Sequence, residues 1–240
     1  MLKRLLVFSA ISARGESFLS QTPLWAFMPA RSSSLAQYMR VSSITRAYGA
    51  PASSFGTTST VVVRDADGLE RLGELLAGLL CRGDVVLLHG DLGAGKTTLS
   101  RGLVRAKLND PEMAVTSPSY LLDNTYNYGV LTSSSSTVDG SEDEGMEVGT
   151  IHHMDLYRLP AHAFDGGMLG IPGIYSSCLC LLEWPERLKD SDLPASYLDV
   201  DITIQKDEAR VVVFRPCGGW GLVSGQAAAM AARLENGDPW

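Results

Sequence analysis

The residues best suited to chemistry form one glycine-rich stretch of the chain, Gly90-Asp-Leu-Gly-Ala-Gly-Lys-Thr-Thr98. Its spacing fits G-x-x-x-x-G-K-[ST], a pattern in which backbone N–H groups and a helix N-terminus converge on one point and attract an anion. An apolar run precedes the stretch, and a helix-forming run follows it. A plain glycine turn is the alternative interpretation, but the motif and its context together favour a loop that holds a nucleoside triphosphate.

Each residue type in this loop has its own expected task. Gly93 and Gly95 let the backbone curl around phosphate groups without a Cβ in the way. Lys96 is predicted to be catalytic through its charge on the outer phosphates, and the hydroxyl of Thr97 is predicted to bind Mg²⁺. The residues predicted to contact the nucleotide are Asp91, Leu92, Gly93, Ala94, Gly95, Lys96, Thr97 and Thr98.

The elements that position this loop follow from the hydrophobic pattern. Val85–His89 is a continuous apolar run, typical of a buried parallel strand, and Asp65 or Asp67 can cap the helix that precedes it. The pattern predicts strands at 60–64, 85–89, 150–155 and 178–183, helices at 65–80 and 97–107, a hairpin of 198–204 with 209–214, and a short helix within 225–235. The expected fold class is therefore α/β, a P-loop NTPase fold with a central, mostly parallel (mixed) sheet flanked by helices.

Two acidic residues end apolar runs and are the predicted partners of the loop. Asp155 ends the run TIHHMD, and Glu183 ends the run CLCLLE. In an α/β sheet, the carboxyl ends of strands near such a loop supply the carboxylates that Mg²⁺ prefers as ligands. Either residue could hold Mg²⁺ or orient the attacking water, and the alternative for each is a solvated acid at a strand end.

The histidines and cysteines are interpreted as structural. His89 is expected to be packed or hydrogen-bonded, and His152 and His153 alternate faces on a strand, so they do not form a metal pair. The cysteines lack a C-x-x-C pair and indicate reduced thiols, not a disulfide frame or a zinc site. They are Cys81, Cys178, Cys180 and Cys217.

Charge is distributed unevenly along the 240 residues. Residues 1–50 carry six basic residues and one acid, a net of +5, which leaves −12 for the remainder of a chain whose net charge is −7. The serine-rich, basic start resembles an organelle transit peptide, with a secretory signal as the weaker interpretation and an unaddressed tail as the alternative. An acidic body is a poor general binder of phosphate backbones, so any contact with nucleic acid is expected to be indirect.

These patterns predict three regions. Residues 1–55 are expected to be a transit peptide and linker without fixed structure, and residues 58–216 an ATPase domain with a flexible serine-rich and acidic insertion at 131–147. Residues 217–240 are expected to be a tail with a short helix. The predicted location is an organelle, with the mitochondrion preferred to the plastid, although composition does not separate the two. No run has the ~18 consecutive apolar residues that a membrane span needs, so no membrane partner is expected.

Four motifs together resemble the TsaE (formerly YjeE) family of ATPases in tRNA threonylcarbamoyladenosine (t6A) biosynthesis. They are GDLGAGKTT, VTSPSYLLDNTY, HMDLYRL and LLEWPERL, in that order, and the resemblance covers about Thr60 to Phe214 apart from the insertion. It implies ATP and Mg²⁺ as cofactors and a threonylcarbamoyl-transferase (TsaD-type) partner, with a TsaB-type subunit as a further candidate. The partner would carry out the transfer to adenosine 37 of tRNA, and tRNA would be met only indirectly.

The resemblance also implies roles for single residues. Lys96 falls on the phosphate-binding lysine, Thr97 and Glu183 on the Mg²⁺ ligands, and Asp155 on the aspartate needed for hydrolysis. The segment Ser117–Ser119 is switch-like, with a serine where the family usually has threonine at its last position. Trp184 is expected to pack near the site, and the regions around Asp65 and Lys206 are weaker candidates for contact with adenine or ribose.

Departures from the family pattern concern partners more than the nucleotide. The stretches PAHAFDGG and IPGIYSS replace an acidic segment and an Arg-Asp-Tyr-like run. The N-terminal extension and the insertion suggest a eukaryotic organelle form. Two other functions stay open: a small-molecule or nucleoside kinase, against which the arginine-free segment 131–147 argues, and a nucleotide-dependent binding module. Arg158 and Arg187 are the candidates for an arginine finger, with surface salt bridges as the favoured interpretation.

Overall fold

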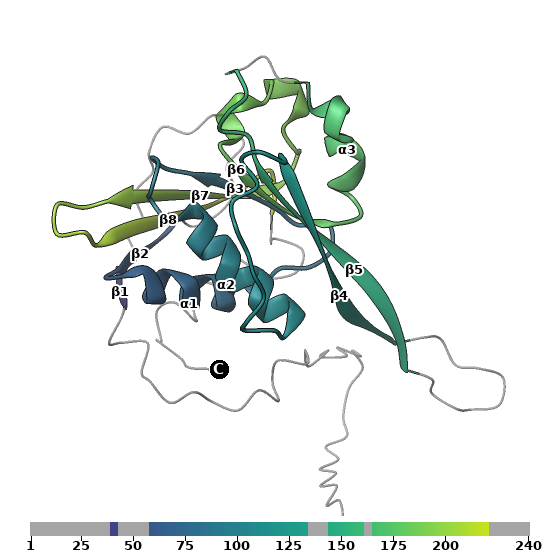
Figure 1. Cartoon of the computed structure of the whole chain (residues 1–240), viewed down its shortest axis with the longest axis horizontal. Helices are drawn as coiled ribbons and strands as arrows, with labels where there is room; N and C mark the ends of the chain where they lie inside the picture. Colours follow the sequence, from purple (N-terminus) through teal and green to yellow (C-terminus); the bar gives the residue numbers. More distant parts are fainter. Residues whose placement is uncertain (1–38, 43–57, 134–143, 161–164, 221–240) are drawn as a thin grey trace, which may run out of the picture.

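The computed structural model describes residues 39–42, 58–133, 144–160 and 165–220. The strands are β1 Met39–Ser42, β2 Ser59–Val63, β3 Val85–His89, β4 Asp123–Ser133, β5 Glu144–Asp155, β6 Leu179–Glu183, β7 Tyr197–Ile204 and β8 Arg210–Cys217. The helices are α1 Ala66–Ala77, α2 Lys96–Leu108 and α3 Ile171–Ile174, with 3₁₀ turns η3 Gly166–Leu169, η4 Pro185–Arg187 and η5 Asp190–Asp192. One eight-stranded sheet in the order β1-β2-β8-β7-β3-β6-β5-β4 organises them (Figure 1).

The middle of the sheet is parallel, and its flanks are antiparallel. β3 pairs in parallel with β7 on one side and β6 on the other, and β6 pairs in parallel with β5. β1, β2, β8 and the outer strand β4 pair in antiparallel fashion. The predicted mixed sheet is confirmed, with its parallel part confined to the four central strands. The carboxyl ends of those strands meet at one edge of the sheet, and the glycine-rich loop follows β3 there.

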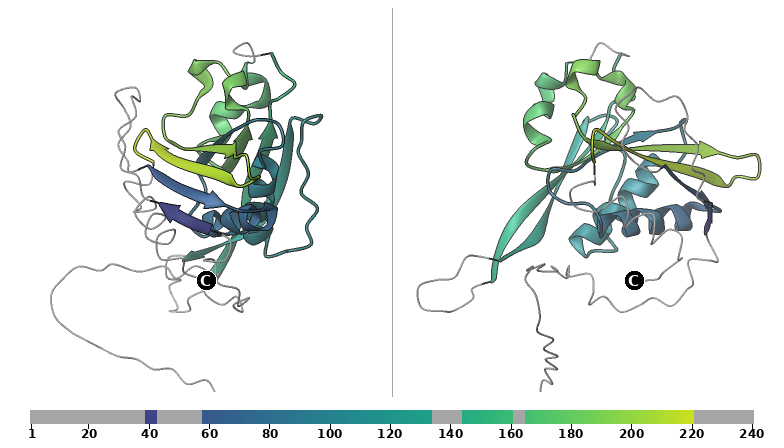
Figure 2. Two further views of the ribbon diagram at one scale, coloured as in Figure 1. Left: turned by 90° about the vertical axis from the view of Figure 1, so that its left-hand side faces the viewer. Right: turned by 180° about the vertical axis from the view of Figure 1, so that it is seen from behind.

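α1 and α2 lie together against one face of the sheet (Figures 1 and 2). The side chain of Asp65 caps α1 by accepting a hydrogen bond from the Gly68 N–H at 2.8 Å. Leucines of both helices, including Leu72 and Leu103, are buried in one cluster with Val86 and Leu88 of β3. Each such side chain contributes roughly 1.5–3 kcal/mol by burial, so this cluster fixes where α2 begins relative to β3.

The other face of β3 is covered by the segment that follows β5. Val85 and Leu87 contact a second apolar cluster that includes Ile171 of α3 and Leu188 after η4. β3 is therefore buried on both faces, which agrees with the unbroken apolar run in its sequence. None of the helices in the described parts of the chain combines the length and apolar character needed to cross a lipid bilayer.

The structure corrects the expected insertion at 131–147. β4 and β5 continue into it as an antiparallel ribbon that pairs as far as Ser133 with Glu144 and extends away from the body in Figure 1. Only residues 134–143 of that segment lie outside the described residues. Composition was misleading because backbone pairing in a two-stranded ribbon does not require apolar side chains.

The expected domain bounds, 58 and 216, are also too narrow, because residues 39–42 and Trp220 belong to the folded part of the chain. Met39–Ser42, placed by sequence in an unstructured leader, pairs with β2 as an edge strand. Trp220, placed in the tail, is buried, and its indole N–H donates to the Asp84 carboxylate at 3.0 Å. The predicted terminal helix at 225–235 and the rest of the expected leader lie outside the described residues.

Candidate active site

The glycine-rich loop has a positive φ at three glycines, and at two of them a Cβ would also meet a neighbouring atom at short distance. Gly90 has a φ of 137°, and a Cβ there would lie 2.4 Å from the carbonyl oxygen of Ile202 on β7. Gly95 has a φ of 110°, and a Cβ there would lie 2.3 Å from Leu69 Cδ2 on α1. The loop thus packs closely between β7 and α1, and α2 begins directly after it. Asp65 caps α1, and Lys206 lies in the turn after β7, so both belong to elements that border the loop.

Lys96 is the first residue of α2 and is almost fully buried. Its ammonium donates to the carbonyl oxygens of Gly90 at 2.6 Å and Asp91 at 3.0 Å. Burial lowers the pKa of Lys96, and the nearby carboxylates of Glu183 and Asp155 oppose that shift. The Lys96 ammonium is therefore poorly hydrated and bonded to the backbone of its own loop. An anion in the loop would compete well with these carbonyl oxygens for the ammonium.

Thr97 and Glu183 come together as predicted. The hydroxyl of Thr97 lies 2.9 Å and 3.2 Å from the two carboxylate oxygens of Glu183, which ends β6 and is buried. His153 of β5 approaches the same carboxylate, with Nε2 2.8 Å from Oε1. The hydroxyl and carboxylate oxygens are the hard ligands that suit Mg²⁺, and they lie beside the glycine-rich loop. The residues present therefore fit this ion.

Asp155 ends β5 next to Glu183, and the two residues pair in register across the parallel strands. One carboxylate oxygen accepts a hydrogen bond from the Ser117 hydroxyl at 2.5 Å, and the other accepts from the Tyr157 N–H at 2.9 Å. Asp155 is also buried. The predicted strand-end acids are thus positioned, hydrogen-bonded groups of one site, and the interpretation of solvated acids is wrong for both.

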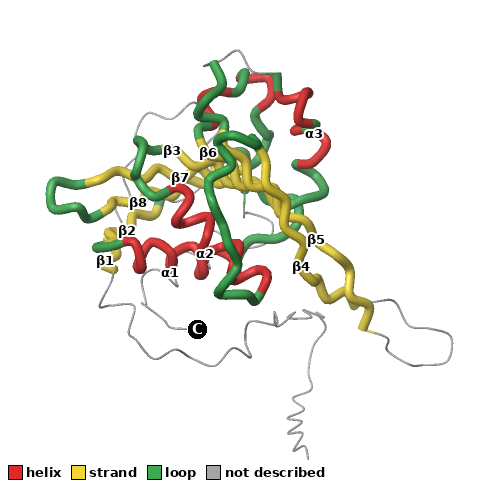
Figure 3. The backbone as a smooth tube through the Cα atoms, viewed as in Figure 1, coloured by secondary structure: helices red, strands yellow, loops and turns green. Residues whose placement is uncertain are grey.

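The loop between α2 and β4, green in Figure 3, carries Ser117 to this carboxylate. Two arginines of α2 hold the loop by its backbone: Arg101 donates to the Val115 carbonyl at 3.1 Å and Arg105 to the Met113 carbonyl at 3.0 Å. Ser119 lies 3.1 Å from Ser117 through their hydroxyl oxygens. The loop is therefore held by α2 at Met113 and Val115 and by Asp155 at Ser117.

Trp184 directly follows Glu183 and closes over the loop lysine. Its ring centroid lies 3.8 Å from the Lys96 ammonium and 4.8 Å from the Tyr157 ring centroid. Trp184 also has a positive φ of 62°, which is unusual for a bulky residue. Such a conformation persists only where surrounding contacts hold it, so the ring is placed at the loop by its backbone as well as by packing.

A family model described as "Threonylcarbamoyl adenosine biosynthesis protein TsaE" matches residues 63–212. The chain belongs to the TsaE family. TsaE from Nostoc sp. is 30% identical over 165 residues, which cover 65% of this chain and 85% of that protein. TsaE from Aquifex aeolicus is 31% identical over 156 residues, which cover 65% and 95%.

A solved structure supports the fold of this TsaE-family chain. The crystal structure of YdiB from Bacillus subtilis matches with a TM-score of 0.52 and 23% identity, over 77% of this chain and 98% of that chain. The likeness shows the P-loop α/β fold. In this fold the glycine-rich segment is the turn between β3 and α2.

His89 of this TsaE-family chain is ionised by its neighbours at the end of β3. Its Nε2 lies 2.8 Å from an Asp199 carboxylate oxygen, and its Nδ1 lies 3.6 Å from Glu186. Burial alone would lower the pKa of His89, but its carboxylate partners outweigh burial and raise the pKa to about 9. Asp199 is the stronger partner, because only its oxygen is within hydrogen-bond range. The expected hydrogen-bonded role for His89 is thus confirmed.

Sequence reasoning underestimated His153 and was wrong about two arginines. His153 was interpreted as structural, yet it contacts Glu183; the H-x-D spacing on a strand, which puts His153 and Asp155 on one face, was an available signal. The Arg158 guanidinium lies 4.1 Å from the Tyr120 ring centroid. The salt bridges expected for Arg158 and Arg187 are not found within the described part of the chain.

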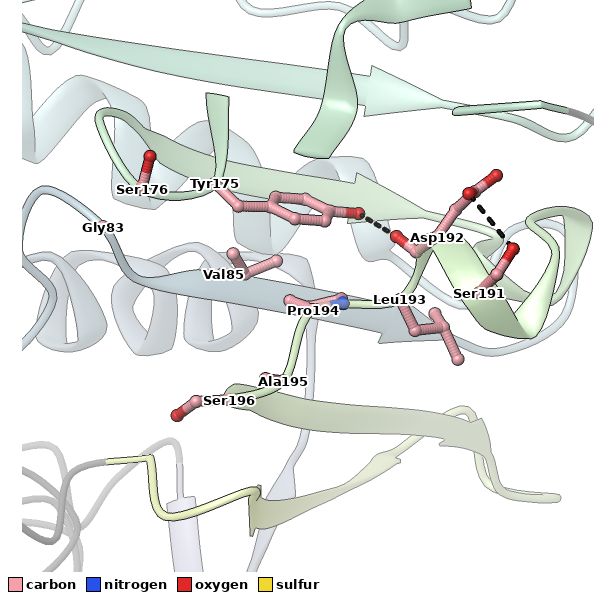
Figure 4. A pocket seen from close by; sticks show the side chains of 10 residues that line it. All are labelled: Gly83, Val85, Tyr175, Ser176, Ser191, Asp192, Leu193, Pro194, Ala195 and Ser196. Atoms are coloured by element: carbon pink, nitrogen blue, oxygen red, sulfur yellow. Dashed lines mark hydrogen bonds between the residues drawn. The ribbon is translucent and has the colours of Figure 1, made fainter. Parts of the chain in front are cut away.

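A hollow on the TsaE domain lies at the other end of β3 from this loop. It encloses about 340 Å³ beside the first residues of β3, and its lining includes Val85, Tyr175 and Asp192 (Figure 4). The Tyr175 hydroxyl donates to the backbone carbonyl of Asp192 at 3.2 Å, and burial raises the pKa of Tyr175. The loop follows the opposite end of β3, so this hollow is separate from the candidate active site.

Proposed function

We propose that the chain is an Mg²⁺-dependent ATPase that assists threonylcarbamoylation of adenosine 37 of tRNA by acting on a threonylcarbamoyl-transferase partner. The observation that carries the proposal is the convergence of Lys96, Thr97, Glu183 and Asp155 at the carboxyl ends of the central strands. The names of the TsaE relatives in t6A biosynthesis support the pathway.

The chain's own residues divide the work of ATP hydrolysis. The backbone of the loop and the N-terminus of α2 bind the phosphates, and Lys96 exchanges its carbonyl partners for phosphate oxygens. Thr97 and Glu183 would hold Mg²⁺, which when bound would supply charge neutralisation at the phosphate oxygens. Asp155, fixed by Ser117 and the Tyr157 N–H, orients the attacking water. Trp184 and Tyr157 shield the lysine from solvent.

Hydrolysis by the isolated chain is expected to be slow. Among the described residues, no arginine pairs with Asp155 or Glu183, and Arg158 is engaged by Tyr120. A P-loop site without a positioned arginine turns over slowly until another group completes it. A TsaD-type partner, together with a TsaB-type subunit, would supply that stimulation. The net charge of −12 beyond residue 50 fits contact with tRNA through the partner alone.

The test is ATP hydrolysis by the full chain, alone and with the TsaD-type protein, in Mg²⁺ and in EDTA. We expect the partner to raise turnover at least about 10-fold, and Lys96→Ala and Asp155→Ala to abolish that rise. Turnover that needs a small-molecule acceptor, with no effect of the partner, would replace this function with a kinase. A third outcome is that partner binding depends on ATP and that the Asp155→Ala variant binds and affects the partner as wild type does. That outcome would indicate a nucleotide-dependent binding module.

An organellar location, with the mitochondrion preferred, belongs to the same proposal. Its support is the basic, serine-rich composition of the first 50 residues. Import of the full chain into isolated mitochondria and, separately, plastids measures it directly. Protection from added protease in one organelle, lost when residues 1–38 are deleted, is the expected result; protection in neither would overturn the location.

A further inference from the structure

We propose that His153 is a positioning residue for the metal side of the site, because it holds the carboxylate of Glu183 in the orientation that Mg²⁺ binding needs. This inference rests on the proposed function and goes beyond it by adding a residue to the site. It also replaces the sequence-based interpretation of His153 as structural.

The strands place His153 for this task. β5 and β6 are parallel neighbours, with His153 opposite Leu181 and Asp155 opposite Glu183. Because side chains alternate along a strand, all four point to one face of the sheet. Leu181 belongs to the apolar cluster of α1 and α2, so this is the face on which α2 presents Lys96 and Thr97. His153 therefore lies one step below the two acids, on the interior side of the site.

The contacts of the ring leave it one polar partner. His153 is fully buried, and its Nε2 lies 2.8 Å from Glu183 Oε1. Its other nitrogen, Nδ1, is buried without a hydrogen-bond partner among the described residues. An ionised carboxylate only accepts hydrogen bonds, so Nε2 is the nitrogen that carries a proton. A buried nitrogen without a hydrogen-bond partner costs stability, so the imidazole ring is unfavourable here in packing terms alone. The hydrogen bond from Nε2 to Glu183 is the contribution that offsets this cost.

The bond from His153 fixes one oxygen of the carboxylate that would hold the metal. Glu183 Oε1 now has two neighbours, the Thr97 hydroxyl at 2.9 Å and His153 at 2.8 Å. A hydroxyl has one proton and two lone pairs, so Thr97 can ligate Mg²⁺ through its oxygen and still donate its single hydrogen bond to Glu183. His153 adds the second hydrogen bond to Oε1 and so keeps the carboxylate from turning. Loss of partners that orient metal ligands in this way typically costs about 10- to 100-fold in metal affinity.

A pair of polar substitutions tests the donor without removing polarity. Gln at position 153 can place an N–H near the position of Nε2, whereas Asn is one carbon shorter and does not reach Glu183. ATP affinity of the full chain is measured by titration calorimetry in EDTA and over a series of Mg²⁺ concentrations. We expect His153→Gln to stay within about 3-fold of wild type, and His153→Asn and His153→Leu to need at least about 10-fold more Mg²⁺ at unchanged affinity in EDTA.

Two controls separate positioning from packing. His152→Leu removes a histidine whose Nδ1 lies 2.7 Å from Asp123, so it breaks a similar pair outside the site and should leave the Mg²⁺ requirement unchanged. In a Glu183→Gln background, His153→Asn should add no further Mg²⁺ defect, because its effect passes through Glu183. Circular dichroism and thermal unfolding establish that each variant is folded.

The outcomes are distinct. If folded His153→Asn shows wild-type Mg²⁺ dependence, or if His153→Gln is as defective as His153→Asn, the inference is wrong. Additive effects in the Glu183→Gln background would also overturn it. If the wild-type chain binds ATP neither in EDTA nor in Mg²⁺, the proposed function fails first and the inference falls with it. Wild-type ATP binding with an unaffected His153→Asn variant overturns the inference alone.

Discussion

The ammonium of Lys96 lies 3.8 Å above the Trp184 ring while it donates to two carbonyl oxygens of its own loop. A ligand phosphate that draws the ammonium away from the loop changes the electrostatic environment of the indole. We therefore expect ATP to change the tryptophan fluorescence of the full chain. Trp184→Phe should remove that change, and Trp220→Phe should retain it. An ATP response that survives Trp184→Phe would contradict the contact as its source.

The loop backbone predicts a contrast between two glycine substitutions. Gly90→Ala forces a Cβ to 2.4 Å from the Ile202 carbonyl at a φ of 137° and should destabilise the domain by about 2–5 kcal/mol. Gly93 also has a positive φ, but a Cβ there would meet open space among the described residues. Gly93→Ala should therefore lower the free energy of unfolding by only about 1 kcal/mol. Urea unfolding of both variants measures the difference. Equal losses would mean that the approach of β7 to the loop is not as close as described.

Ser117 should affect turnover more than binding. Ser117→Ala removes the hydrogen bond to Asp155, which leaves the carboxylate with only the Tyr157 N–H. Hydrogen bonds to charged groups are worth about 1.5–3 kcal/mol, so we expect partner-stimulated hydrolysis to fall roughly 10-fold or more at similar ATP affinity. Ser117→Thr retains the hydroxyl and should retain turnover. An equal loss in both variants would point to a steric role for the position.

His89 makes stability depend on pH in a definite window. Its pKa is about 9 in the folded protein against 6.5 as the ordinary value, so the folded state holds the proton more tightly. The resulting stabilisation is complete below about pH 6.5 and is lost as the pH rises towards 9. The side chain is 35% exposed, so solvent screening limits the effect to about 1 kcal/mol. Unfolding free energies at pH 6 and 10, roughly the limits of that window, should differ less in His89→Gln than in wild type.

Trp220 should behave as part of the core although it lies beyond the last strand. Trp220→Ala removes a buried ring and its hydrogen bond to Asp84, and we expect a loss of about 3–5 kcal/mol in unfolding free energy. Trp220→Phe keeps most of the apolar volume and should lose about 1 kcal/mol for the missing hydrogen bond. Thermal unfolding compares the two. A neutral Trp220→Ala variant would place the end of the domain before this residue.

The loop, its lysine and its two acids could be predicted because local chemistry demands their residue types. A phosphate-binding turn needs glycine at 90 and 95, and an acid that ends a buried apolar run in a parallel sheet meets the others at one edge. The resemblance to the TsaE family implied separate roles for Asp155 and Glu183. The fold class followed from the same pattern.

What could not be predicted depends on pairing and on side chains from distant segments. The strands in the expected insertion are held by the backbone of a ribbon, which composition does not encode. The stacking of Trp184 on Lys96 requires a positive φ that no sequence rule assigns to tryptophan. The bond of His153 to Glu183 depends on the register of β5 with β6, which is a tertiary fact.

The order of strands has a consequence for how the site forms in time. Among the described strands, β3, which precedes the loop, pairs with β6 and β7 alone. Val86 of β3 can therefore pair only after Leu181 and Leu198 have been reached along the chain. Parallel pairings between segments so far apart are slow to close, because loop entropy is lost before contacts compensate for it. A chain that is still folding thus exposes its glycine-rich motif long before a sheet supports it. If the chain binds ATP as proposed, ATP can stabilise only the late, nearly complete domain, so nucleotide binding would mark the end of folding.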